Sequence, residues 1–186
     1  NKNKADIINL SWGYYADEQN ETLERQLHFA RQQGALIVAS TGNDAKSIDV
    51  CSHWPSNFTA VFPNEMIAVA ALDRLRSNGT MGIASYSNTG QIADLAAPGT
   101  MIKGAMLGTE NGYIELSGTS MAAGVISRRA AMLKYTVGGA SGMRANLIKQ
   151  QILNETDQDF MICTNNNRKY RMAADPTLRA AIGYTP

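Results

Sequence analysis

Two short segments of the chain carry side chains suited to acyl-transfer chemistry. In the first, Leu116-Ser117-Gly118-Thr119-Ser120-Met121-Ala122, a turn of small residues runs directly into a helical pattern, which places Ser120 in the first turn of the helix. Backbone N–H groups there have no partner within the helix, and the helix dipole adds to their preference for negative charge. A serine at that point could attack a carbonyl group while the developing oxyanion meets donors already in place. Taken alone, Ser120 fits better as an ordinary helix cap.

The second segment ends in an amide side chain. Asn43 follows the almost purely apolar run 35–39, which predicts a buried parallel strand. Residues after the carboxyl end of such a strand lie at the edge where α/β sheets build their sites. The amide of Asn43 could therefore donate a hydrogen bond to an oxyanion, although the residue by itself fits better in an Asx-turn.

Strands and helices alternate in the first half of the chain, and the longer predicted strands are apolar on both faces. The spacing of apolar residues predicts helices over 20–33, 119–135, 143–154 and 178–182. The sequence also predicts a loop over 40–64 and a hairpin that pairs 101–105 with 113–116. It predicts strands over 6–11, 35–39, 66–71, 83–86 and 92–95, the last stopped by Pro98-Gly99. This pattern is typical of an α/β fold with a parallel sheet, and a length of 186 residues fits one domain over 1–186.

Composition argues against several classes of protein. The 17 basic and 16 acidic residues nearly cancel and no basic run is present, which disfavours a nucleic-acid binder. No apolar stretch approaches the roughly 20 residues of a membrane span. A nucleotide-binding α/β domain is disfavoured because no G-x-G-x-x-G follows the first strand.

Metal and disulfide chemistry have little support in the sequence. His28 and His53 are too far apart to suggest a metal site, and no C-x-x-C pair occurs. Cys51 and Cys163 are too few for a disulfide framework. A single bridge between them in an oxidising compartment stays open, because the sequence does not give the distance between two cysteines.

Taken together and in order, these segments resemble the subtilisin-like serine peptidases along most of the chain. The S-G-T-S-M-A run at 117–122 is similar to the family's nucleophile motif, and I-N-L-S-W-G at 8–13 to its substrate-binding strand. The other matching segments are 34–43 before the oxyanion asparagine, Trp54–Phe58 with 66–73, then 84–88, 94–99, 147–157 and 170–182.

The resemblance implies a three-layer α/β fold around a parallel sheet and a set of site residues. Ser120 would be the nucleophile, and Asn43 with the backbone N–H of Ser120 would form the oxyanion hole. The residues that would flank the pocket for the substrate residue before the scissile bond are Ser11, Trp12, Gly13, Ser40, Thr41 and Gly42, with His53 at its floor. It also implies protein or peptide substrates and a secreted or other extracytoplasmic location. Structural calcium is common in the family, but no oxygen-ligand loop can be picked out here, and the chemistry requires no cofactor.

The chain departs from the family where the general base and its partner are concerned. The family carries its histidine in an H-G-T context and its aspartate in a D-T-G or D-S-G context, and neither motif occurs. His28 lies within a predicted helix and reads as a surface or packing residue. By the resemblance, both motifs precede the point that matches Asn1. We therefore expect 1–186 to be the C-terminal part of a catalytic domain whose N-terminal segment, in cis or as a separate chain, supplies the histidine and aspartate.

The nucleophile helix departs as well. The family continues S-M-A with a small or polar residue and then Pro and His, whereas Ala123-Gly124-Val125-Ile126 follows here. Arg128 and Arg129 occupy a helix that is normally buried; they either extend from its far side or mark a more exposed helix. Two hypotheses follow: a serine endopeptidase that works through an acyl-enzyme on Ser120, or a catalytically inactive relative that acts as a binding module or scaffold.

Overall fold

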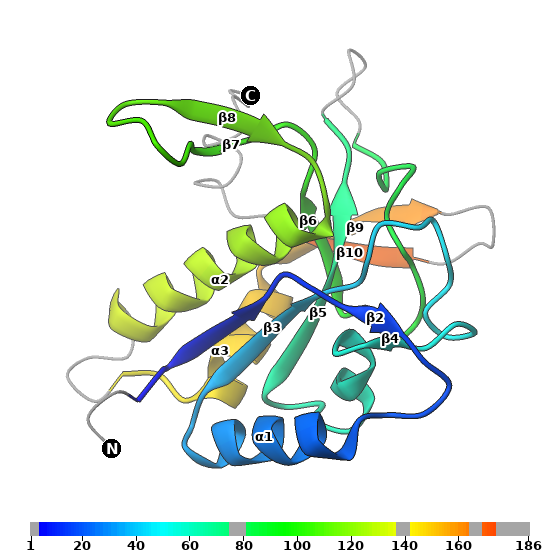
Figure 1. Cartoon of the computed structure of the whole chain (residues 1–186), viewed down its shortest axis with the longest axis vertical. Coiled ribbons are helices and arrows are strands. Elements are labelled where there is room, and N and C mark those ends of the chain that lie inside the picture. The colour runs from blue at the N-terminus through cyan, green and yellow to red at the C-terminus, as the bar shows by residue number, and fades with distance from the viewer. Residues whose placement is uncertain (1–3, 75–80, 137–141, 164–168, 174–186) are drawn as a thin grey trace.

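The computed structural model describes residues 4–74, 81–136, 142–163 and 169–173, which build one mixed sheet with helices on both faces (Figure 1). In spatial order, the six strands are β1 Ile7–Leu10, β3 Leu36–Ser40, β5 Met66–Leu72, β6 Leu95–Pro98, β10 Lys169–Ala173 and β9 Thr156–Cys163. Neighbouring strands are parallel from β1 to β10, and β9 runs antiparallel to β10. The predicted α/β fold with a parallel sheet is confirmed, with an antiparallel strand added at one edge.

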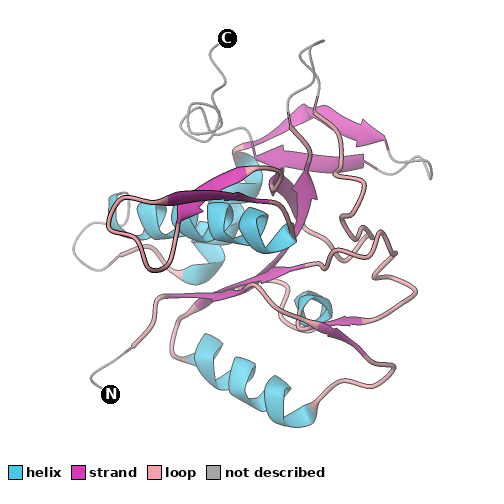
Figure 2. Cartoon of the chain, turned by 45° about the horizontal axis from the view of Figure 1, so that its top comes forward, coloured by secondary structure: helices cyan, strands magenta, loops and turns pink. Residues whose placement is uncertain are grey.

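The helices cover the two faces of the sheet in separate layers (Figure 2). Helices α2 (Thr119–Thr136) and α3 (Ala145–Asn154) pack on one face, where alternate residues of the strands meet their apolar sides. On the other face, α1 (Glu21–Gln32) and the short 3₁₀ helix η1 (Ser56–Ala60) pack against the remaining strand residues. The central strands β3 and β5 are fully buried, as expected for parallel strands covered on both sides.

Local signals explain where the helices begin and which face they bury. The side chain of Asn20 accepts a hydrogen bond from the backbone N–H of Leu23 at 3.0 Å and so caps α1. Gly34, with φ of +88°, ends that segment in a conformation that glycine adopts without strain. In α2 the residues of one apolar face are all buried: Ala122, Ile126, Ala130 and Leu133.

Several predicted elements differ from the structure. The segment 83–86 is not a strand, because only Ile83 forms an isolated bridge, to Leu72. The strand predicted over 92–95 is wrong in position: the side chain of Asp94 accepts a hydrogen bond from the backbone N–H of Ala68, and the ladder begins only at Leu95. The strand ends at Pro98, so the predicted stop at Pro98-Gly99 is confirmed.

The chain from 40 to 64 is more than a loop. It contains η1 and the two-residue strand β4 (His53–Trp54), which pairs antiparallel with β2 (Tyr14–Tyr15). Strands β9 and β10 were not predicted, and the helix predicted over 178–182 lies outside the described residues. The predicted hairpin is confirmed as β7 (Ile102–Ala105) paired with β8 (Tyr113–Leu116).

Two open features of the architecture bear on function. β1 is the first strand of the sheet, and among the described residues it pairs only with β3, so its outer edge is free. The β7–β8 hairpin extends from the body of the molecule on the side of α2 (Figures 1 and 2).

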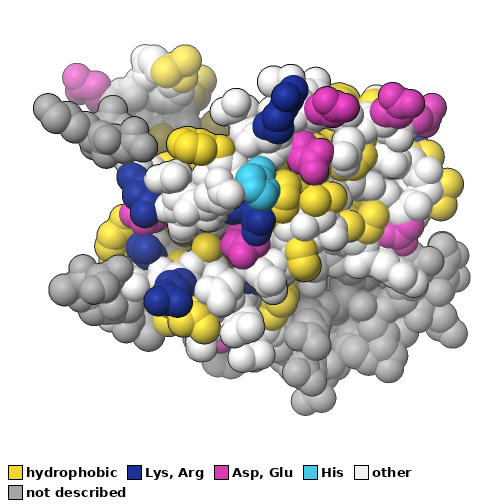
Figure 3. Space-filling model, turned by 90° about the horizontal axis from the view of Figure 1, so that it is seen from below, with side chains coloured by type: hydrophobic (Ala, Val, Ile, Leu, Met, Phe, Trp, Pro, Cys, Tyr) yellow, Lys and Arg dark blue, Asp and Glu magenta, His cyan; other side chains and the backbone are white. Residues whose placement is uncertain are grey.

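The surface is otherwise mixed in character. Acidic, basic and apolar side chains are interspersed on the face seen from below, and that face shows no continuous basic patch (Figure 3). Within the described residues, no helix combines the length and apolar character needed to cross a membrane. Cys51 is exposed with a free thiol, so the bridge to Cys163 that the sequence left open is not formed in this structure.

A buried ion pair fastens α3 to the sheet. The Lys149 ammonium lies 2.6 Å from an Asp94 carboxylate oxygen and donates to the carbonyl of Met66 at 2.6 Å. The second carboxylate oxygen of Asp94 accepts from the N–H of Ala68 at 2.8 Å. Burial raises the pKa of Asp94 above its usual value, and the ammonium of Lys149 opposes that rise. The pair therefore depends on both partners being present.

Replacing Lys149 with Met is expected to lower the free energy of unfolding by about 3–5 kcal/mol at neutral pH, because it leaves Asp94 buried without a counter-charge. Without Lys149, the pKa of Asp94 in the folded state rises further above its unfolded value. The folded state then binds more protons than the unfolded state, so the deficit should shrink as the pH falls from 7 toward 4. Urea unfolding followed by tryptophan fluorescence measures this, with Lys149→Met/Asp94→Asn as the matched control. A deficit below about 1 kcal/mol, or one that grows on acidification, would contradict the prediction.

Candidate active site

The structure brings Ser120 and Ser11 together, although they are far apart in the sequence. Ser120 lies in the first turn of α2, as predicted, and its hydroxyl donates to the backbone carbonyl of Ser11 at 3.1 Å. The hydroxyl of Ser11 donates in turn to the carbonyl of Ser120 at 2.8 Å. These reciprocal bonds fix the end of β1 against the start of α2, and the Ser120 hydroxyl is only partly buried. Its reach toward solvent and a nearby strand edge suits a nucleophile that must meet an extended substrate.

Asn43 lies beside the same helix start in a defined orientation. Its side-chain oxygen Oδ1 accepts two hydrogen bonds from Thr119, one from the backbone N–H at 2.8 Å and one from the hydroxyl at 2.9 Å. The Thr119 hydroxyl also accepts from the N–H of Gly42 at 3.1 Å. Because Oδ1 is occupied, the donor Nδ2 is the part of the amide left for a ligand. Asn43 as a whole is exposed, so this donor can be reached from solvent.

His53 lies between the two backbone segments that the sequence predicts on either side of the pocket. A Cβ built on Gly13 would come within 2.2 Å of its Cε1 atom, and one built on Gly42 within 2.9 Å of its Nε2 atom. Only 4% of His53 is exposed. The ring therefore fills the space between these glycines, and any side chain in place of Gly13 or Gly42 would collide with it.

The hydrogen bonds of Ser56 identify the tautomer of His53. The Ser56 hydroxyl donates its single proton to the carbonyl of His53 at 2.8 Å. It also lies 2.8 Å from Nδ1 of the same residue, so in that contact Nδ1 must be the donor. Burial lowers the pKa of His53 below its usual value, and the carboxylate of Asp44 only partly opposes this. At neutral pH the ring is thus uncharged, with a free lone pair on Nε2.

Asn88 organises the loop that carries Asn43, and its role was not predicted. Its side-chain oxygen accepts from the N–H groups of Asp44 at 3.1 Å and Lys46 at 2.9 Å. Its amide nitrogen donates to the carbonyl of Thr41 at 2.7 Å and to the hydroxyl of Tyr15 at 2.6 Å. With Asn88 fully buried, one side chain holds the loop in place at both ends.

Tyr15 closes the other side of this region. Its hydroxyl donates to Asp44 at 2.8 Å, and its ring meets that of His53 edge-on at 5.2 Å between centroids. Lys46 lies over the Tyr15 ring at 4.2 Å from the centroid. In the sequence, the adjacent aromatic residues Tyr14 and Tyr15 were the only sign of this contact.

The remaining predicted residues fall into two groups. Ser40 and Thr41 are buried at the end of β3 and shape the strand edge through bonds to Leu10 and Asn88, whereas Trp12 is half exposed. His28 lies on α1, across the sheet from Ser120, and contacts Arg31, Gln32 and Phe62. The prediction that His28 is a surface or packing residue agrees with this position.

The arrangement combines a partly exposed hydroxyl, an oriented amide donor and an unpaired strand edge. Such a set can receive an extended peptide, present a serine to its carbonyl group and stabilise an oxyanion. Within the described residues, no group of three or more His, Cys, Asp or Glu side chains lies close enough together to hold a metal ion.

Comparisons with known proteins show which family the chain belongs to. A family model described as the Subtilase family matches residues 1–184. The Thermophilic serine proteinase of Bacillus sp. (strain AK1) is 34% identical over 152 residues, which are 82% of this chain and 32% of that protein. The Minor extracellular protease Epr of Bacillus subtilis (strain 168) is 33% identical over 132 residues, or 71% of this chain and 18% of that protein.

A solved structure extends the similarity to the fold. The self-cleaved protease domain of PatA is 28% identical, with a TM-score of 0.71, and the match covers 98% of this chain and 64% of that one. The chain thus spans about a third or less of the two curated relatives and under two thirds of the solved domain. With a family match over nearly its whole length and the same fold, the chain belongs to the subtilase family of serine peptidases.

Proposed function

We propose that this chain carries the nucleophile and the oxyanion hole of a serine endopeptidase. The Ser120 hydroxyl attacks the carbonyl carbon of a peptide bond, and its proton passes to a histidine that lies outside this chain. The tetrahedral oxyanion is stabilised by Nδ2 of Asn43 and the backbone N–H of Ser120. Collapse of that intermediate releases the amine and leaves an acyl-enzyme on Ser120, which water then hydrolyses.

The observation that carries this proposal is the pair of bonds from Thr119 to Asn43. An asparagine in an ordinary Asx-turn bonds only to the backbone of its own turn. Here Thr119 holds Oδ1 through two donors, and Gly42 in turn donates to the Thr119 hydroxyl. The donor Nδ2 is therefore preorganised beside the residue that precedes Ser120, which is what electrostatic stabilisation of an oxyanion requires.

The free edge of β1 is where we propose that the segment carrying the histidine and the aspartate joins the sheet. A parallel strand added there would end beside Ser11 and Ser120, because β1 itself ends at that point. We infer that a segment in cis or from a separate chain adds this strand and brings the histidine and aspartate. The location we propose is extracytoplasmic, by analogy with relatives such as the Minor extracellular protease Epr.

Labelling with a fluorophosphonate probe tests the proposal. The chain alone should not react, whereas mixing or fusing it with the N-terminal segment of its domain should give labelling at Ser120 that disappears in Ser120→Ala. The reciprocal bonds between Ser11 and Ser120 leave a second candidate, an inactive binding module in which this hydroxyl is structural. A completed domain that binds peptides but never labels would favour the binding module.

The position of His53 leads to a prediction about substrate choice. Its ring occupies the space between Gly13 and Gly42, so the residue before the scissile bond should be small, and the neutral Nε2 should favour one with a donor, such as Ser or Thr. Acidic residues would face a lone pair at neutral pH and should be poor substrates. His53→Gly in the completed enzyme should raise kcat/KM for Phe at that position about 10–100-fold relative to Ser.

Both enzymes are assayed with a peptide library that carries every residue at that position. Ser56→Ala is the matched control, because it keeps the His53 ring and removes the hydroxyl that contacts its Nδ1. The hypothesis fails if the unaltered enzyme prefers Phe and Leu and the His53→Gly profile is the same.

A further inference from the structure

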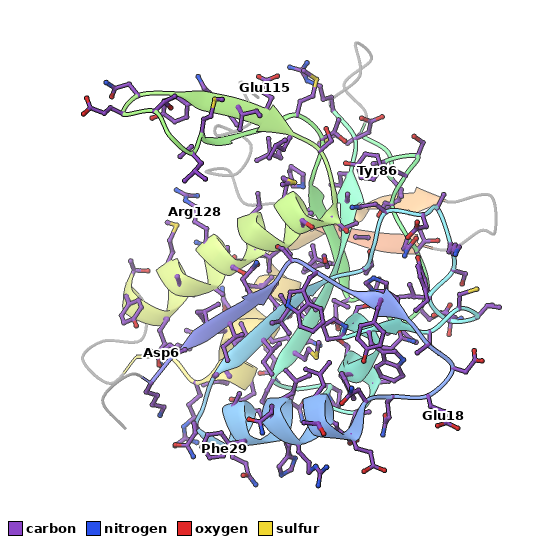
Figure 4. The ribbon with its side chains drawn as sticks, in the orientation of Figure 1. Asp6, Glu18, Phe29, Tyr86, Glu115 and Arg128 are labelled. Atoms are coloured by element: carbon purple, nitrogen blue, oxygen red, sulfur yellow. The ribbon has the colours of Figure 1, made fainter. Side chains whose placement is uncertain are left out.

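One side of the molecule presents apolar side chains that no described residue covers. In the β7–β8 hairpin the strand register places Ile102, Gly104, Ile114 and Leu116 on one face and Lys103 and Glu115 on the other. Glu115 points away from α2 (Figure 4), so the apolar face is turned toward the helix side. Ile114 is 39% and Leu116 45% exposed, which is high for residues of this type on a shared face.

Two glycines show that this face is open. A Cβ built on Gly104 of the hairpin would meet no atom within 4 Å, and the same holds for Gly124 of α2. Arg128 lies beside Gly124 on the helix surface, because residues four apart are neighbours. We call this surface the hairpin–helix face: Gly104, Ile114, Leu116, Gly124 and Arg128.

Arg128 is the single charge on the hairpin–helix face. It is exposed, extends from α2 on the hairpin side (Figure 4), and no carboxylate pairs with it within the described part of the chain. Its neighbour Arg129 is bound to Glu155 through bonds of 2.8 and 2.6 Å. The helix thus carries one paired arginine and one exposed arginine without a partner among the described residues.

The hairpin–helix face adjoins the free edge of β1. Ser127 of α2 donates to Asn9 of β1 at 2.8 Å, and Tyr135 donates to Asp6 at 2.7 Å. A polypeptide that adds a strand to β1 would therefore lie next to α2, within reach of the hairpin. The solved PatA domain is longer than this chain, which covers 64% of it, so a complete domain has further chain to place there.

We propose that the hairpin–helix face receives an extended segment from the part of the domain that this chain does not span, and that the segment places a carboxylate against Arg128 among apolar side chains. The inference rests on the proposed function, in which the same part brings the base. A covered arginine must be paired, because an unpaired charge is costly to remove from water. A carboxylate meets a guanidinium through two parallel hydrogen bonds, which also fixes the position of the segment.

A second copy of the chain suits this face less well. In a two-fold contact the same patch faces itself, so two Arg128 side chains would approach each other. None of the five residues of the face offers a carboxylate, so the repulsion would stay uncompensated. The charge therefore favours a different polypeptide segment as the occupant.

Isothermal titration tests the proposal with the Ser120→Ala chain and the segment encoded upstream of residue 1, produced as a separate polypeptide. Arg128→Glu should weaken the association at least about 30-fold, since it removes a pair and adds repulsion. Arg128→Lys should stay within about threefold, because the charge remains. Arg25→Glu, at another exposed arginine on the far side of the molecule, is the matched control and should change nothing. Circular dichroism confirms that each variant is folded.

Charge reversal identifies the partner. In the segment, one Asp or Glu replaced by Arg should restore most of the affinity lost in Arg128→Glu. No association at all, association that Arg128→Glu leaves unchanged, or self-association of the chain that depends on Arg128 would each overturn the proposal. Binding is the readout, so association that depends on Arg128 without fluorophosphonate labelling would uphold this inference and reject the proposed catalysis. Fluorophosphonate labelling of the completed domain, together with binding that Arg128→Glu leaves unchanged, would uphold the proposed catalysis and reject this inference.

Discussion

Residues 1–186 alone are expected to hydrolyse a peptide substrate about 10⁶-fold more slowly than the domain completed by its N-terminal segment, which is the loss in kcat when subtilisin is deprived of its histidine. A serine hydroxyl is a weak nucleophile at neutral pH unless a base takes its proton. In this structure the Ser120 hydroxyl donates to a backbone carbonyl, which is not a base that can remove the proton.

Neither histidine of the chain can replace the missing base. His28 lies on α1, on the opposite face of the sheet from α2. His53 is buried between two glycines, and its Nδ1 proton is held by Ser56. Hydrolysis of a chromogenic peptide, measured at equal concentrations of Ser120 with and without the segment, gives the ratio. Turnover by the isolated chain that vanishes in His28→Ala or His53→Ala would show that one of them acts as the base.

In the completed enzyme, Asn43→Leu is expected to lower kcat by about 10²–10³ while KM changes by less than about threefold. The leucine keeps the size of the side chain but has no donor for the oxyanion, which exists only during the reaction and not in the bound substrate. A change in KM with kcat preserved would show that the amide binds the ground state instead, and would remove Asn43 from the oxyanion hole.

Substitutions of Thr119 test the same donor more mildly, because they change only the contacts that orient Asn43. Thr119→Val removes the hydroxyl that donates to Asn43 and accepts from Gly42, yet keeps the backbone N–H that also holds Oδ1. We expect a smaller loss in kcat, about tenfold, because the amide is loosened and not removed. Thr119→Ser keeps the hydroxyl and should recover most of the rate. Equal rates for the Val and Ser variants would indicate that the hydroxyl does not position Asn43.

The sequence was informative where function depends on local context. The small-residue turn before a helical pattern located Ser120 in the first turn of α2, and the apolar run 35–39 located Asn43 just beyond a parallel strand. Both inferences need only neighbouring residues and the geometry of strand and helix ends. The hairpin that pairs 101–105 with 113–116 was predictable for the same reason.

What the sequence did not show depends on contacts between distant segments. Asn88 holds the loop of Asn43 through partners more than 40 positions away, and its own neighbours in the chain give no sign of that. The true start of β6 was missed because the side chain of Asp94 takes up a hydrogen bond of the ladder and delays regular pairing. The tautomer of His53 likewise follows from the fold of the 53–56 turn, not from the identity of the residues.

The exposed position of Asn43 is expected to limit the working life of the completed enzyme. Asparagine amides are among the groups that hydrolyse when proteins are kept warm. Conversion of Asn43 to Asp would leave the oxygen bound by Thr119 satisfied and the local fold unchanged, while a negative charge took the place of the donor. Asn88, by contrast, is fully buried and its amide is engaged at both ends. In the completed enzyme, molecules converted at Asn43 should therefore be folded, inactive, one charge more acidic than the fresh protein, and separable from it by isoelectric focusing.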